Sequence, residues 1–147
     1  MTFRATSQLL INSLTRAKSL ALSLKGTCDQ YATLMTGGAT ADDIFQLHAT
    51  MTGMIANFNT IAAVPNLATY AQAQEGDDTY NIATEFTAMV TALTTVRNWI
   101  EANFPKDGNG NLLSHTFVNH VRTPVSFTAQ QLLTLRSNVL ALSDTIS

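Results

Sequence analysis

The sequence predicts a mainly α fold: an antiparallel four-helix bundle with an extra short helix and a small β-hairpin or arm before the last helix. Apolar residues recur at steps of three and four in four long segments, the spacing that forms one stripe along a helix. Glycine, proline and capping residues separate these segments, and a turn-rich stretch interrupts the helical pattern before the last one. We therefore expect a single helical-bundle domain, residues 1–147, with a projecting loop or hairpin at about 105–127.

The first helical segment carries its apolar stripe over nearly thirty residues. The stripe consists of Leu10, Leu14, Ala17, Ala21, Leu24, Cys28, Tyr31 and Met35. Gly37 and Gly38 then predict the end of the helix, because glycine readily adopts the left-handed backbone found there.

A second helix is expected to begin after Thr40, which stands three residues before Asp43 in a variant of the capping box. Its stripe consists of Ile44, Leu47, Met51, Met54, Phe58 and Ile61. Pro65 favours an ending here, since the residue before a proline is biased away from helical geometry. Residues 66–75 then predict a short helix, followed by a polar turn at 76–78.

Two further long helices follow. Asp78 or Thr79 is the expected cap of the third, whose stripe consists of Ile82, Phe86, Met89, Leu93, Val96 and Ile100. The last helix has a clear start, because Thr128 and Gln131 form a capping box and Phe127 with Leu132 a hydrophobic staple. Its stripe consists of Leu132, Leu135, Val139, Leu142 and Ile146.

Residues 105–111 concentrate the proline, aspartate, asparagine and glycine that favour turns. The segments 112–117 and 122–127 carry β-branched and aromatic residues on either side of 118–121, so they predict a hairpin or projecting arm. Pro124 suits an edge position, because proline cannot donate a hydrogen bond to a neighbouring strand.

Calcium binding is the nearest match to a metal motif. Asp107, Asn109 and Asn111 copy the first three ligand positions of a calcium-binding loop. Leu112 and Val118 then stand where the motif needs glycine and glutamate, so a turn is favoured over a calcium site.

The remaining chemistry-bearing residues complete no catalytic or cofactor signature, so we expect no enzyme activity, no metal and no cofactor. His115 and His120 lack a third ligand nearby, and an odd spacing along a strand places side chains on opposite faces. Cys28 is the single cysteine and falls on an apolar stripe, where it is expected to be a small hydrophobe. His48 lies beside the second stripe and is expected at the boundary of the core.

Charge is scarce: 12% of the residues are charged, against roughly 25% in ordinary domains. Thr, Ser, Asn and Gln replace ions on the outward positions, and charge is depleted from interface cores. The composition therefore favours assembly, with other copies of the chain among the partners. The candidate interface residues are Trp99, Phe104, Phe117, His115, His120 and Arg122, although the large aromatics can equally close one end of the bundle.

The first helix carries a basic face. Its residues are Arg4, Arg16, Lys18 and Lys25, and the expected partners are Asp42, Asp43, Asp77 and Asp78 or a neighbouring subunit. A nucleic-acid-binding regulator is an alternative, but the net charge is −2 and this helix lacks the aromatic interleaving typical of single-strand binding. A bundle that binds a small ligand between Met and aromatic side chains is another alternative. The apolar runs are too short to cross a bilayer, so no membrane partner is expected.

Several stretches resemble segments of small, largely uncharacterised helical proteins encoded by tailed bacteriophages. These stretches are Ile61–Pro65, Tyr70–Gln74, Ala83–Met89, Trp99–Pro105 and Phe127–Gln131. The resemblance implies a virion structural protein: a head–tail connector or neck component, or a minor capsid, decoration or tail protein. It also implies location in the virion after assembly in the bacterial host cytoplasm, with copies of itself and other virion proteins as partners.

Overall fold

The computed structural model describes the backbone of residues 2–146 and the side chains of residues 7–117 and 119–146. The helices are α1 (Thr2–Thr36), α2 (Ala41–Ala62), α3 (Leu67–Glu75), α4 (Ile82–Asn103) and α5 (Ala129–Asp144), and the strands are β1 (His115–Val118) and β2 (Val121–Pro124). Helices account for 71% of the chain, which confirms the mainly α fold with a small antiparallel sheet.

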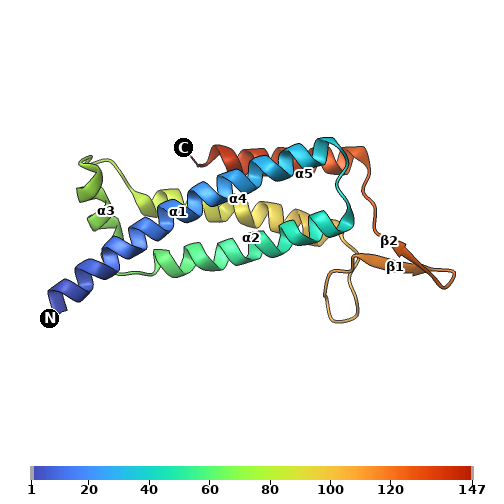
Figure 1. Ribbon diagram of the computed structural model, residues 1–147, viewed down its shortest axis with the longest axis horizontal. Coiled ribbons are helices and arrows are strands. Elements are labelled where there is room, and N and C mark those ends of the chain that lie inside the picture. The colour runs from blue at the N-terminus through green and yellow to red at the C-terminus, as the bar shows by residue number, and fades with distance from the viewer. Residues whose placement is uncertain (1, 147) are drawn as a thin grey trace.

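The long helices pack side by side as in a helical bundle (Figure 1). Helix α2 packs on α4, α4 on α5, α5 on α1, and α1 on α2. The short helix α3 lies at one end, against α1 and α4, and the hairpin extends from the opposite end along the long axis (Figure 1).

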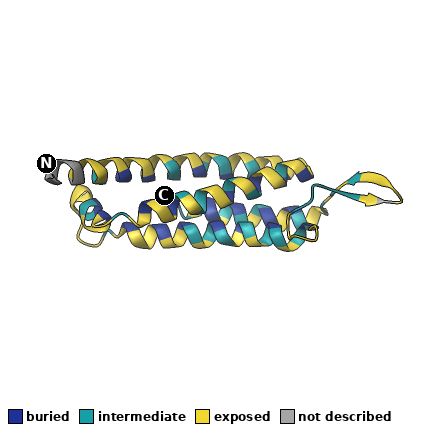
Figure 2. Cartoon of the chain, turned by 90° about the horizontal axis from the view of Figure 1, so that it is seen from below, coloured by how far each residue is buried: buried dark blue, intermediate teal, exposed yellow. Residues whose placement is uncertain are grey.

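The apolar stripes face inward, as the sequence predicts (Figure 2). Every stripe residue of α4 and the whole stripe from Leu132 to Ile146 is buried. In α1 and α2 most stripe residues are buried, and Leu10, Ala21, Tyr31 and Met54 are half-buried against the same core. Since each fully buried Leu, Ile, Phe or Met contributes about 1.5–3 kcal/mol, these stripes dominate the stability of the fold.

Two capping boxes begin α2 and α5 as expected. The Asp43 amide donates to Thr40 Oγ1 at 3.2 Å, and the Thr40 amide donates to Asp43 Oδ2 at 2.9 Å. Thr128 and Gln131 repeat this exchange at 3.1 and 2.8 Å. Each box satisfies amides that a helix leaves unpaired at its start.

The expected N-terminal cap of α4, Asp78 or Thr79, is wrong. Asn81 fills this role, because its Oδ1 accepts from the amides of Ala83 at 3.0 Å and Thr84 at 3.4 Å. Asp77 instead closes the preceding turn, where it accepts from the Thr79 amide at 2.9 Å and hydroxyl at 2.7 Å. The turn thus takes up the residues assigned to the cap, and the helix begins at Ile82.

The break at Pro65 is confirmed as an ending of α2. The chain leaves the helix after Ala62 and re-enters one at Leu67 through Asn66, whose φ of 67° is left-handed. Asparagine tolerates this conformation better than most residues, so it directs α3 away from the axis of α2.

The hairpin is confirmed, with shorter strands than expected. Val118 pairs with Val121 and Phe117 with Arg122. Asn119 and His120, with φ of 52° and 65°, form the two-residue connection typical of a type I′ turn. This turn sets the register of the two strands. Strand β2 ends at Pro124, and Leu112, expected in the first strand, pairs with Lys106 in an isolated bridge.

Candidate functional site

Aromatic side chains fix both roots of the segment 105–127, which we call the arm. The Phe104 ring, just before the arm, lies 5.2 Å from that of Phe127 at its end. Phe45 from α2 lies 6.3 Å from Phe104, and Trp99 lies 6.5 Å from Phe127. Aromatic pairs at these distances add stability beyond burial. Trp99 and Phe104, two of the candidate interface residues, thus close one end of the bundle, which the sequence allows as the alternative to an interface role.

The first part of the arm is a loop closed by one carboxylate. Asp107 accepts from the Asn109 amide at 2.8 Å and from the Asn111 amide at 2.9 Å, while its own amide donates to the Asn111 carbonyl at 2.9 Å. The Asn111 and Asn109 amides lower the pKa of the Asp107 carboxyl. The residues that resemble a calcium-binding loop therefore form hydrogen bonds with one another.

The hairpin presents a mixed apolar and cationic face. Phe117 and Arg122 lie opposite each other on the two strands, and His115 lies on the same face, two residues before Phe117. Arg122 Nη2 lies 3.3 Å from His115 Nδ1, within hydrogen-bond distance. The Phe117 side chain is 76% exposed and Val121, near the tip, is 63% exposed.

The two histidines of the arm do not meet. His115 begins β1, whereas His120 lies in the turn beyond the strand end. The three steps from His115 to Val118 alone span about 10 Å. Among the residues whose side chains are described, no three or more His, Cys, Asp or Glu residues gather as metal ligands would.

The described basic side chains of α1 contact other parts of the chain, and none of them pairs with Asp42, Asp43, Asp77 or Asp78, the intrachain partners expected for them. Lys18 pairs with Glu75 at 3.2 Å, and Arg16 Nη2 donates to Asn57 Oδ1 at 3.4 Å. Lys25 Nζ donates to the carbonyls of Ile146 at 3.0 Å and Ser143 at 3.3 Å. A cation there suits the negative C-terminal end of α5. The Arg4 side chain lies outside the described residues.

A half-buried hydrogen bond that the sequence does not predict links α2 to α4 near the arm. His48 Nε2 lies 3.0 Å from Glu101 Oε1, and Arg97 Nε lies 3.9 Å from the same oxygen. The hydrogen bond from His48 lowers the pKa of the Glu101 carboxyl. The two residues are 53 positions apart, so no local pattern signals the pair. The expected boundary position of His48 is confirmed.

The single thiol has the environment of a core residue. Cys28 is fully buried, and burial raises its pKa to about 12, with Asp29 acting in the same direction and Lys25 against it. Since the thiolate is the reactive form, a thiol held neutral in the core is chemically inert.

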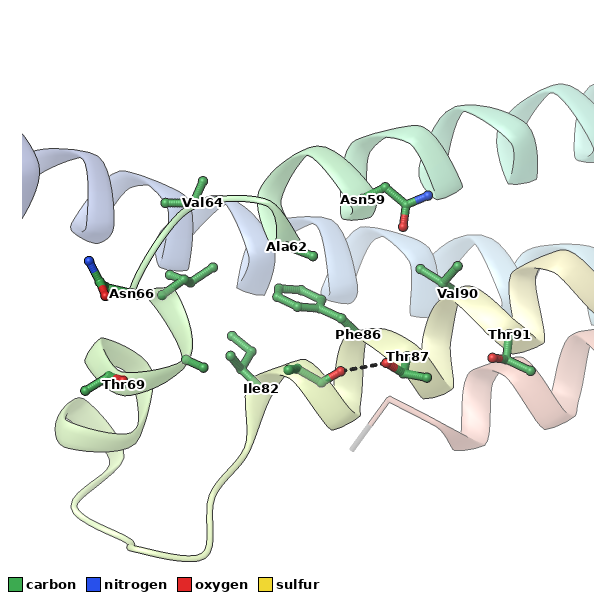
Figure 3. A pocket seen from close by; sticks show the side chains of 13 residues that line it. Asn59, Ala62, Val64, Asn66, Thr69, Ile82, Phe86, Thr87, Val90 and Thr91 are labelled. Atoms are coloured by element: carbon green, nitrogen blue, oxygen red, sulfur yellow. Dashed lines mark hydrogen bonds between the residues drawn. The ribbon is translucent and has the colours of Figure 1, made fainter.

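A groove of about 550 Å³ opens at the end of the bundle opposite the arm (Figure 3). We call it the α2–α3–α4 groove after the helices that border it. Apolar side chains include Val64, Ile82 and Phe86, and the rim includes Thr87 and Thr91 from the outer side of α4. No ionisable residue is among those that line it. No sequence pattern predicts the groove, because threonines outside an apolar stripe carry no signal of a binding site.

A second hollow of about 330 Å³ lies between α1, the start of α4 and the end of α5. Lys18, Tyr80 and Glu85 are among its lining residues. The Tyr80 hydroxyl donates to Glu85 Oε2 at 3.2 Å, and burial, followed by the charge of Glu85, raises the Tyr80 pKa to about 12. Tyr80 and Glu85 therefore already bind each other, and Lys18 pairs with Glu75.

Across residues 2–146, no helix combines the length and apolar character needed to cross a membrane. Comparisons with models of protein families, with curated proteins and with solved structures found no match for this chain.

Proposed function

We propose that this chain is a non-enzymatic structural subunit of a tailed-phage virion, assembled in the bacterial host cytoplasm. In this proposal it is a head–tail connector or neck component repeated in a ring, with copies of itself and other virion proteins as partners. The four long helices form an antiparallel bundle that serves as the body of the subunit, and the arm reaches a neighbour. A minor capsid, decoration or tail protein is the alternative position in the particle.

The arm is the observation that carries the proposal. Phe117, a large aromatic side chain on β1, is 76% exposed. Both roots of the arm that carries it are fixed by buried or half-buried aromatic side chains. A rigid support lowers the entropy lost on binding, and a large aromatic is a frequent anchor of interfaces. Exposed apolar groups on such a projection are suited to a permanent contact.

The outer faces of the helices support the same proposal. On α4, the exposed side includes Thr84, Thr87, Thr91 and Thr95. Thr87 Oγ1 donates to the Ala83 carbonyl at 2.9 Å, and Thr95 Oγ1 donates to the Thr91 carbonyl at 3.0 Å. Hydroxyls bonded to their own helix can enter an interface with less loss of hydration than lysines or glutamates, whose charges are costly to bury.

Two measurements test the proposal. Light scattering coupled to size-exclusion chromatography is expected to give a mass that is a multiple of the 15.9 kDa chain. Mass spectrometry of purified phage particles is expected to find its peptides at a fixed ratio to the major capsid protein. A strictly monomeric chain that is absent from particles would contradict the proposal.

The α2–α3–α4 groove favours a second candidate function, binding of a small ligand. Its volume of about 550 Å³ lies within the range of ligand pockets, roughly 300–1,000 Å³. Phe86 lines it, whereas Met35, Met51 and Met89 are buried in the core. A ligand that raises the melting temperature of the wild-type chain, but not of Thr91→Trp, would support this function over the structural one.

A nucleic-acid-binding regulator is the third candidate. Lys18 and Lys25 contact Glu75 and the end of α5, which leaves them less available to phosphates. Binding to DNA that weakens steeply with salt, and that is lost in Arg16→Ala, would support this candidate.

A further inference from the structure

We propose that the arm of one copy binds in the α2–α3–α4 groove of a second copy. Phe117 enters the groove, and Arg122 lies beside the acidic turn at residues 76–78 of the copy that receives it. The inference names the partner surface of the arm, and it rests on the proposed function in one respect: copies of the chain associate.

The arm offers one apolar and one cationic group on the same face. Phe117 and Arg122 are directly paired across the hairpin, so their side chains emerge side by side. Residues 112–127 contain this arginine and two histidines but no aspartate or glutamate. The arm is thus suited to an apolar surface with carboxylates at its edge.

The groove offers the matching surface. All its lining residues fall between 59 and 91, inside the segment 49–96, which has four carboxylates and no lysine, arginine or histidine. One of the four, Glu75, pairs with Lys18. Asp77 and Asp78 are exposed on the turn that joins α3 to α4, two of the helices that border the groove. An apolar groove within a segment whose ionised side chains are all carboxylates complements Phe117 and Arg122.

The two surfaces lie at opposite ends of one molecule (Figure 1). Helix α4 has 22 residues, a length of about 33 Å, and separates the groove at its start from the arm at its end. An arm that points away along the long axis cannot fold back over that distance, so the groove it fills belongs to another copy. Different patches then meet at each contact, so head-to-tail repetition closes into a ring or continues as a filament, while reciprocal exchange of arms between two antiparallel copies gives a two-fold dimer.

Single substitutions at each surface test the contact. Phe117→Ala removes the anchor, and Thr87→Arg places a long charged side chain at the groove that Phe117 enters. Each is expected to weaken self-association of the full chain by roughly 30-fold or more in sedimentation equilibrium, as loss of an interface anchor does. Leu133→Ala is the matched control, because Leu133 is 56% exposed on α5 and belongs to neither surface. Unchanged thermal unfolding of the variants shows that they remain folded.

Mixing the two variants gives a sharper result. Phe117→Ala keeps an intact groove, and Thr87→Arg keeps an intact arm, so one productive contact remains between them. Native mass spectrometry is expected to show one-to-one dimers in the mixture and only monomers in each variant alone. A contact between identical patches would not be restored by mixing.

A charge exchange tests the polar part of the contact. Arg122→Glu is expected to weaken association, and combination with Asp77→Lys and Asp78→Lys in the same chain is expected to restore it. Association that is unchanged in Phe117→Ala, Thr87→Arg and Arg122→Glu would overturn this inference and leave the virion proposal standing. A monomeric wild-type chain, or an arm that captures only a different virion protein, would overturn it as well, and mass spectrometry of particles then decides the proposed function separately.

Discussion

The core of the bundle and the hairpin of the arm place aromatic side chains in opposite environments. Phe58 of α2 is fully buried, with its ring 5.9 Å from that of Phe86, whereas Phe117 of β1 is 76% exposed. The shape of the arm depends instead on polar contacts, such as those of Asp107, and on the left-handed turn at Asn119 and His120. Burial of apolar groups therefore stabilises the bundle and the roots of the arm, while local hydrogen bonds shape the rest of the arm and leave Phe117 and Val121 available for contact.

Truncation of these two phenylalanines should give the largest difference between the regions. Phe58→Ala leaves a cavity in a packed core and is expected to lower the free energy of unfolding by about 3–5 kcal/mol. Phe117→Ala removes an exposed side chain and should change it by no more than about 0.5 kcal/mol at concentrations where the chain is monomeric. Urea unfolding followed by circular dichroism measures both values. Similar losses for the two variants would mean that the arm is part of the stabilising core.

Alkaline pH should act mainly on the bundle. The folded state raises the pKa of Cys28 from 9.0 and of Tyr80 from 10.0, each to about 12. In the unfolded chain these groups ionise at their ordinary pKa values, whereas in the folded chain they stay neutral until about pH 12. Their contribution to stability is therefore complete below about pH 9 and is lost as the pH rises towards 12.

The measurement is the urea midpoint between pH 8 and 12, which is expected to fall more steeply in the wild type than in Cys28→Ala. A thiol reagent at pH 8 should modify Cys28 only in the unfolded chain, since the native thiol is buried and neutral. Rapid modification of the folded chain would contradict the assigned environment.

The sequence predicts those parts of the molecule that depend on neighbours along the chain. The helical stripes, the boxes at Thr40 and Thr128 and the turn near Asn119 are all set by residues within a few positions. The cap at Asn81 was missed because Asp78 and Thr79, equally good cap formers, precede it and are used by a turn.

Contacts between distant segments could not be predicted in this way. Lys18 meets Glu75 and His48 meets Glu101 only because α3 packs near α1 and α2 on α4. The groove likewise depends on how α3 turns away after Asn66. The exposed position of Phe117 follows from the direction of the whole arm, which no pattern within the hairpin specifies.

Glycine should respond with opposite sign in the two regions. Gly53 in α2 and Gly110 in the arm both have open space where a Cβ would lie, so backbone conformation alone distinguishes them. Gly53→Ala is expected to stabilise the chain by about 0.5–1 kcal/mol, because alanine favours the helix. Gly110 has a φ of 82°, so Gly110→Ala strains the loop and should destabilise it by about 1 kcal/mol. Thermal unfolding measures the first effect and hydrogen exchange of the loop amides the second. A gain in Gly110→Ala would show that the loop relaxes readily.

Acid should act on the arm without unfolding the bundle. The amides of Asn111 and Asn109 lower the pKa of the Asp107 carboxyl from 3.8, so its contribution is present above that value and is lost as the pH falls through the lower, folded pKa. The amide resonances of Asn109 and Asn111 are expected to move together at acidic pH and to occupy their low-pH positions at pH 7 in Asp107→Ala. Circular dichroism of the helices should change little over the same interval, since Asp107 belongs to none of them. If the helices melted together with the loop, the arm and the bundle would be one cooperative unit, and the arm would then owe its shape to the core as well as to its own hydrogen bonds.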